Sequence, residues 1–167
     1  MYDELTEVDI QKMREEIDYR VRVLRPKLIE DVQTARAFGD LSENFEYKCA
    51  KQEKNRNDSR IRYLERMIRT AKVITAVSQD DVVGLFDKVT IFNEKLGKEM
   101  TIQIVTTLRQ DALQGRISKE SPVGKSLMGR RTGERVLVKV SDELQYYLTI
   151  RSIEKGEDDA SMDISSY

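Results

Sequence analysis

Two carboxylates with a spacing suited to metal binding, Asp40 and Glu43, directly follow Gly39, which separates two long stretches of sequence that contain no glycine. Carboxylates three residues apart can share one Mg²⁺ ion, which takes one or two protein carboxylates and fills its other positions with water or substrate oxygens. Such a site would be weak alone, so a partner would have to supply the remaining ligands. A structural alternative stays open: Gly39 could end one helix, and Asp40 and Glu43 could form a capping box that starts the next.

The composition excludes most other catalytic chemistry. The 167 residues include no His and a single Cys, Cys49. Without His there can be no Ser-His-Asp or Cys-His triad and no imidazole-based zinc site, and one Cys cannot form an intrachain disulfide or a four-Cys site. No apolar run approaches the roughly 20 residues of a membrane span, and the first residues lack the basic start of a signal peptide. We therefore expect a cytoplasmic protein that has no membrane partner.

Apolar residues repeat at steps of three and four on both sides of Gly39. They predict one amphipathic helix from Ile10 to Phe38 and a second with a heptad seam from Tyr47 to Ala71. Because each stripe can be buried only against the other, we expect an antiparallel coiled-coil hairpin over residues 1–76 with its tip at 39–47. Pro26 predicts a bend in the first helix near residues 22–25. Asn57, on the seam, could fix the register or lie exposed, and both interpretations remain open.

The periodicity changes after the second helix. Four β-branched or aromatic runs with a period of two predict strands at 89–92, 101–105, 135–140 and 145–150. Ser121, Pro122 and Gly129 are spaced as the N-cap, first residue and C′ residue of one short helix. These elements predict a small α+β domain over residues 82–155. The acidic segment that follows, 156–167, is expected to be mobile.

The nearly balanced charge, 29 Lys and Arg against 30 Asp and Glu, conceals a strong local pattern. From Lys48 to Lys72 there are nine basic and three acidic residues, whereas 40–46 holds three acidic residues and no basic one. The basic stretch could be a solvated helix surface with i,i+4 ion pairs. It could also follow the phosphates of a nucleic acid, as in a coiled coil that binds DNA or RNA directly.

The segment Gly39-Asp-Leu-Ser-Glu-Asn-Phe-Glu-Tyr47 resembles the tip signature GDLxENxEY of the bacterial Gre transcript-cleavage factors and matches every fixed position. The resemblance covers nearly the whole chain, including Arg25-Pro26, residues 70–74, Ser121-Pro122 and Gly129. The basic stretch is interrupted, which favours the GreA type over the GreB type. The implied fold is an N-terminal antiparallel α-helical coiled-coil hairpin followed by a small FKBP-like α+β domain.

The resemblance implies a transcription elongation factor that binds the secondary channel of bacterial RNA polymerase. There it would stimulate Mg²⁺-dependent cleavage of the 3′ end of backtracked RNA and rescue arrested complexes. Asp40 and Glu43 would help to hold a catalytic Mg²⁺ ion shared with the polymerase active site. The protein would have no cofactor of its own and would not itself be an enzyme. A Gre-like protein that occupies the channel and inhibits transcription is the alternative.

Further site residues follow from the resemblance. Arg36 and Lys51 are expected to face the extruded RNA, with solvated helix residues as the alternative. Glu120, Ser121 and Pro122 are expected to contact the rim helices of the largest polymerase subunit, although a helix N-terminus explains Ser121 and Pro122 equally well. The chain is expected to act as a monomer. The residues expected to support the tip are Gly39, Leu41, Ser42, Asn44, Glu46 and Tyr47.

An FKBP-like domain raises the question of prolyl isomerase activity, which needs a pocket lined by aromatic side chains. Between residues 87 and 157 the chain offers only Phe92, Tyr146 and Tyr147. We therefore do not expect that activity.

Overall fold

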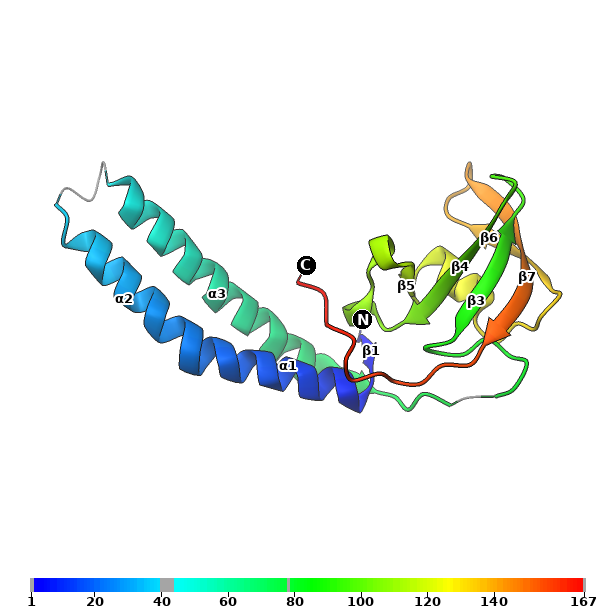
Figure 1. The fold of residues 1–167 in the computed structure, drawn as a ribbon, viewed down its shortest axis with the longest axis horizontal. Helices are drawn as coiled ribbons and strands as arrows, with labels where there is room; N and C mark the ends of the chain where they lie inside the picture. The colour runs from blue at the N-terminus through cyan, green and yellow to red at the C-terminus, as the bar shows by residue number, and fades with distance from the viewer. Residues whose placement is uncertain (1, 40–43, 78, 167) are drawn as a thin grey trace. The chain divides into compact units, whose positions relative to one another are not determined.

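The computed structural model describes residues 2–39, 44–77 and 79–166 (Figure 1). The chain divides into two compact units. One is the helical unit Ile10–Ala71, and the other, the sheet unit, combines Met1–Asp9 with Lys72–Tyr167. Each unit is described separately below.

The helical unit is the antiparallel hairpin that the sequence predicts. Helix α1 (Glu7–Tyr19) begins in the sheet unit and continues through a π-helical turn η1 (Arg20–Leu24) into α2 (Arg25–Arg36). The returning helix is α3 (Phe45–Thr70), which packs alongside α2 (Figure 1). At a rise of 1.5 Å per residue, the 26 residues of α3 make a rod of about 39 Å.

The irregularity that Pro26 predicts appears as the π-helical turn. In η1 the backbone N–H of Arg25 donates to the carbonyl oxygen of Arg20, five residues earlier. Asn57 is only 3% exposed, and its Nδ2 donates to the same carbonyl at 3.3 Å, while its Oδ1 accepts from the Arg20 guanidinium at 3.0 Å. The structure therefore favours the interpretation of Asn57 as a buried residue that fixes the pairing of the two helices.

Beside Asn57, the interior of the hairpin contains an ion pair that the apolar periodicity does not predict. Arg60 is 2% exposed and donates to both carboxylate oxygens of Glu16, at 2.8 and 3.2 Å. Arg20 donates to the same carboxylate at 2.8 Å. Burial raises the pKa of Glu16, but the hydrogen bonds from Arg60 and Arg20 outweigh it and hold the pKa below its usual value. The apolar residues buried along α3 are Ile61, Leu64 and Met67.

The sheet unit has a five-stranded sheet in the order β5-β4-β3-β7-β6 among the described residues. Neighbouring strands are antiparallel except for the parallel pair β4 and β5. The strands are β3 (Lys88–Asn93), β4 (Lys98–Val105), β5 (Arg116–Ser118), β6 (Arg135–Lys139) and β7 (Gln145–Glu154). All four predicted strands are present. The additional strand, β5, has three residues, too few to show a period of two.

Short helices connect the strands of this sheet and cover part of its core. They are the 3₁₀ turns η2 (Thr107–Arg109) and η3 (Ala112–Gln114) and the α-helix α4 (Pro122–Leu127). Helix α4 has the predicted cap, since the Ser121 hydroxyl accepts from the Gly124 N–H at 3.0 Å. The buried core includes Phe86, Ile91, Ile104, Leu127 and Ile150.

The first residues of the chain belong to the sheet unit rather than to the predicted hairpin domain 1–76. Strand β1 (Glu4–Leu5) pairs in parallel with β2 (Lys72–Val73), directly after the second long helix. These two strands form a sheet of their own, and residues 2–9 and 72–76 belong to the sheet unit. In the segment 156–167, expected to be mobile, the described residues form hydrogen bonds within the same unit: the N–H of Gly156 donates to Asp87, and the N–H of Ser165 donates to the carbonyl oxygen of Leu108.

Candidate functional site

The candidate site lies at the end of the hairpin, where α2 ends at Arg36 and α3 begins at Phe45. Four of its predicted residues, Asp40, Leu41, Ser42 and Glu43, lie outside the described residues. Gly39 lies beside them at φ +120°, a backbone conformation that only glycine adopts readily. This agrees with the predicted role of Gly39 in ending the first helix.

Asn44 joins the two arms of the hairpin at this end. Its Oδ1 accepts from the backbone N–H of Tyr47 at 3.0 Å, and its Nδ2 donates to the carbonyl oxygen of Ala35 at 2.7 Å. The first contact is an N-cap, and the second connects the start of α3 to the end of α2. Asn44 is therefore the residue that caps α3. The alternative in which Asp40 and Glu43 start this helix as a capping box is wrong, because the helix begins at Phe45.

Arg36, Tyr47 and Lys51 come together next to Asn44. The Arg36 guanidinium lies over the Tyr47 ring, 5.7 Å from its centroid. Hydrogen bonding to Arg36, with the charges of Lys51 and Arg36, holds the pKa of the Tyr47 phenol below its usual value. Both basic residues are exposed, as is Glu46 in the first turn of α3. The end of the hairpin thus presents two cations to solvent. Arg36 lies four residues before the segment 40–47, and Lys51 lies four residues after it.

The described part of the chain contains no cluster of three or more His, Cys, Asp or Glu side chains placed to hold a metal ion. Asp40 and Glu43 fit Mg²⁺ by donor type, because this ion prefers oxygen ligands and accepts one or two carboxylates from a single protein. Among the described residues, no helix is long and apolar enough to cross a membrane.

The second predicted site, at Glu120, Ser121 and Pro122, lies in the sheet unit where the loop after β5 leads into α4, whose first residue is Pro122. The Ser121 hydroxyl caps α4 and donates to the carbonyl oxygen of Ser118 at 2.7 Å, while Glu120 and Pro122 are exposed. Lys119 Nζ lies 3.6 Å from Glu120 and also pairs with Glu4. Hydrogen bonding to Lys119 is the main cause that lowers the pKa of Glu4. These contacts hold the loop in place and leave the Glu120 and Pro122 side chains on its surface.

The sequence does not predict the burial of Arg109, the largest fully buried side chain among the described residues. Arg109 is 0% exposed; its Nε donates to Asp9 at 2.7 Å, and one of its terminal nitrogens donates to Thr6 at 3.1 Å. It also pairs with Asp158 and stacks on the ring of Phe86. Asp9 is 100 positions away in sequence. No local pattern indicates such a partner.

Two family models together cover most of the chain. One, described as "Transcription elongation factor, N-terminal", matches residues 4–73, and the other, described as "Transcription elongation factor, GreA/GreB, C-term", matches residues 78–155. The second match ends one residue before Gly156, so segment 156–167 lies outside both.

Curated relatives match over nearly the same length. The transcription elongation factor GreA of Geobacillus kaustophilus is 42% identical over 135 residues, which cover 80% of this chain and 85% of the relative. GreA of Staphylococcus carnosus is 35% identical over 150 residues, 90% of this chain and 94% of the relative. Among solved structures, Gfh1 of Thermus thermophilus is 23% identical to this chain and superposes with a TM-score of 0.43. The aligned residues cover 93% of this chain and 100% of the Gfh1 chain.

Proposed function

The chain belongs to the GreA/GreB family of transcription elongation factors, and from this premise we propose that it acts within the secondary channel of bacterial RNA polymerase. There it stimulates cleavage of the 3′ end of backtracked RNA, so that arrested complexes resume elongation. The partner is the polymerase together with the extruded RNA, and the protein acts as a monomer in the bacterial cytoplasm. It is not a nuclease by itself, since the cleaving active site is that of the polymerase.

The observation that supports this proposal most is the end of the hairpin. Asn44 and the Arg36–Tyr47 contact fix the two helices on either side of the segment that holds Asp40 and Glu43. Capping of α3 is performed by Asn44, so the two carboxylates are not needed to start the helix. Their presence at the end of a rod of about 39 Å suits delivery into a narrow channel.

Each group has a chemical role in this proposal. Asp40 and Glu43 would hold a Mg²⁺ ion, and the polymerase and the RNA would supply its other ligands. When bound, the ion would polarise water and neutralise charge on the phosphodiester. Arg36 and Lys51 attract the phosphates of the extruded RNA, and Glu120, Ser121 and Pro122 contact the rim helices at the channel entrance. The long hairpin raises the effective concentration of two carboxylates that would bind a free ion weakly.

One assay tests the proposal. A polymerase complex backtracked by a defined number of nucleotides, with RNA labelled at its 5′ end, is incubated with Mg²⁺ in the presence and absence of the protein. We expect faster shortening of the RNA and recovery of elongation when nucleotides are added. Slower elongation without RNA shortening would contradict the proposal and indicate a channel-blocking inhibitor. RNA cleavage by the protein without polymerase would contradict the claim that it is not a nuclease.

A further inference from the structure

The segment beyond the matched family domains, residues 156–166, runs as a hydrogen-bonded strap along the sheet unit. Its first residue is Gly156, whose N–H donates to the buried carboxylate of Asp87 at 3.0 Å. A Cβ atom at this position would lie 2.0 Å from the carbonyl oxygen of Phe86, so the approach requires glycine. The strap therefore begins at a position built for close backbone contact.

The buried guanidinium of Arg109 holds the next part of the strap. It donates to the carbonyl oxygen of Asp159 at 3.2 Å and pairs with the carboxylate of Asp158. The same guanidinium is fixed from the other side by Asp9 and Thr6. A guanidinium holds several acceptors in a rigid geometry, and here two of them come from the strap. The last part is tied by the N–H of Ser165, which donates to the carbonyl oxygen of Leu108 at 2.7 Å.

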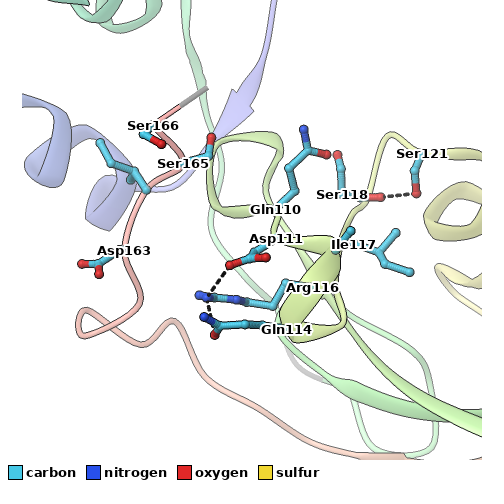
Figure 2. Close-up of a pocket in the computed structure, with 12 residues that line it drawn as sticks. Gln110, Asp111, Gln114, Arg116, Ile117, Ser118, Ser121, Asp163, Ser165 and Ser166 are labelled. Atoms are coloured by element: carbon cyan, nitrogen blue, oxygen red, sulfur yellow. Dashed lines mark hydrogen bonds and ion pairs between the residues drawn. The ribbon is translucent and has the colours of Figure 1, made fainter.

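Between the end of the strap and the segment 110–121 there is an open groove of about 710 Å³ (Figure 2). Strap residues 163–166 line one wall, while η3, β5 and the loop before α4 line the other. Figure 2 shows Ser118 and Ser121 at one end of the groove and Asp163 on the opposite wall. The groove thus reaches the loop that carries Glu120 and Pro122.

The chemistry of the groove favours a basic partner with an apolar side chain. Arg116 is neutralised within the wall, because it lies 3.6 Å from Asp111 and also donates to Gln114. Asp163 is exposed and carries a negative charge on the strap wall. Glu120, exposed on the loop at the other side, pairs with Lys119 at 3.6 Å and with Lys125 at 3.9 Å. Leu113, in η3 between the lining residues Ala112 and Gln114, is 99% exposed and adds an apolar side chain beside this wall.

We propose that the strap extends the polymerase-docking surface, forming with residues 110–121 a groove that takes a basic segment of RNA polymerase. This inference rests on the proposed function, which places Glu120, Ser121 and Pro122 against the polymerase. The strap adds to that loop a second wall and an acidic side chain, Asp163. Complementary charge at the edge of an interface speeds association and makes it sensitive to salt.

The test compares binding of fluorescently labelled full-length protein and variants to RNA polymerase at low and high salt. A truncation that removes residues 160–167 deletes the strap wall but keeps Asp158 and Asp159 on Arg109. We expect it to bind about tenfold more weakly. Asp163→Asn is expected to bind about threefold more weakly at low salt, with little difference at high salt, because screening weakens exposed charges. Asp142→Asn, which removes an exposed carboxylate outside the groove, is the matched control and should bind like the unaltered protein.

The possible outcomes separate this inference from the proposed function. Equal affinity of the truncated and full-length proteins would overturn the docking role of the strap, and so would tighter binding, which would mean that the strap covers the docking loop. Both results leave the proposed function intact if the full-length protein binds polymerase and stimulates cleavage. Failure of the full-length protein to bind polymerase would instead contradict the proposed function. Equal thermal unfolding of the full-length and truncated proteins confirms that the truncation leaves the fold intact.

Discussion

The guanidinium of Arg36 lies over the ring of Tyr47, 5.7 Å from its centroid, and so joins the last turn of α2 to the first turn of α3. Arg36 precedes Asp40 by four residues, and Tyr47 follows Glu43 by four. The contact therefore fixes the chain on both sides of the two carboxylates. It also leaves the charge of Arg36 at the exposed end of the hairpin, where it would meet RNA.

Removing a cation at this end should weaken the action of the protein on backtracked complexes. For Lys51→Gln we expect the concentration that gives half-maximal RNA cleavage to rise about tenfold, the equivalent of about 1.4 kcal/mol for one charge-assisted contact to phosphate. The measurement is a titration of the protein against a backtracked complex. Arg62→Gln, at an exposed position farther along α3, is the control. An equal effect of both substitutions would indicate general electrostatic attraction rather than a contact at the tip.

Asn44→Ala should destabilise the hairpin at its end. It removes the N-cap of α3 and the hydrogen bond to Ala35, so we expect a loss of about 2 kcal/mol in the free energy of unfolding, as for strong caps. Chemical denaturation followed by circular dichroism measures this loss. Asn55→Ala changes an exposed Asn within the same helix and should have little effect. A similar loss in both variants would rule out a special role for Asn44.

The N-cap of α3 is also a feature that the sequence did not predict. The two helices, Gly39 as a helix terminator and the Ser121 cap of α4 were predictable, because apolar periodicity and capping residues are local signals. The only start of α3 considered from the sequence was a capping box of Asp40 with Glu43, whereas the structure has Asn44 as the N-cap. Asn44 also bonds to Ala35, nine residues away, a contact that no local rule predicts.

The burial of charged side chains could not be predicted from the sequence either, because their ion-pair partners are distant in sequence. Arg60 reaches Glu16 across 44 positions, and Arg109 reaches Asp9 across 100. The π-helical turn, expected only as a bend before Pro26, is bonded to Asn57 on the other helix. Such features follow from the tertiary packing of segments that are distant in sequence, which the sequence predicts as a topology but not in atomic detail. For the predicted metal ligands, Asp40 and Glu43, the sequence remains the only source, because they lie outside the described residues.

Acid should destabilise the hairpin through Glu16. Its folded-state pKa is lowered, so the ionised carboxylate stabilises the folded state above the unfolded pKa of about 4.3, and this contribution is lost as the pH falls through the folded value. Glu16→Gln should lower the free energy of unfolding by about 3 kcal/mol at neutral pH and make its decline in acid shallower. Unfolding curves from neutral to acidic pH test this. Glu53→Gln, at an exposed ion pair, should leave the slope unchanged, and an unchanged slope in Glu16→Gln would contradict the assignment.

The buried guanidinium of the sheet unit should be essential for stability. Arg109→Met removes the partner of the buried Asp9 and the contacts to Asp158 and Asp159, so we expect a loss of about 3–5 kcal/mol. The same change at the exposed Arg151 should cost less than about 1 kcal/mol. Hydrogen exchange of residues 156–166 provides a second readout, because these amides should lose protection in Arg109→Met. Retained protection would mean that the strap does not depend on Arg109.

We propose that Asp40 and Glu43 act in RNA cleavage and not in folding. The most direct test is the rate of RNA cleavage in a defined backtracked complex with Asp40→Asn, Glu43→Gln and the double variant, each at a concentration that saturates polymerase. We predict that every variant binds polymerase and keeps the helical content of the unaltered protein, while stimulated cleavage falls at least about 100-fold, as expected when a group that acts at the reacting centre is removed. Cleavage at the unaltered rate, or loss of helix in step with loss of cleavage, would contradict the claim.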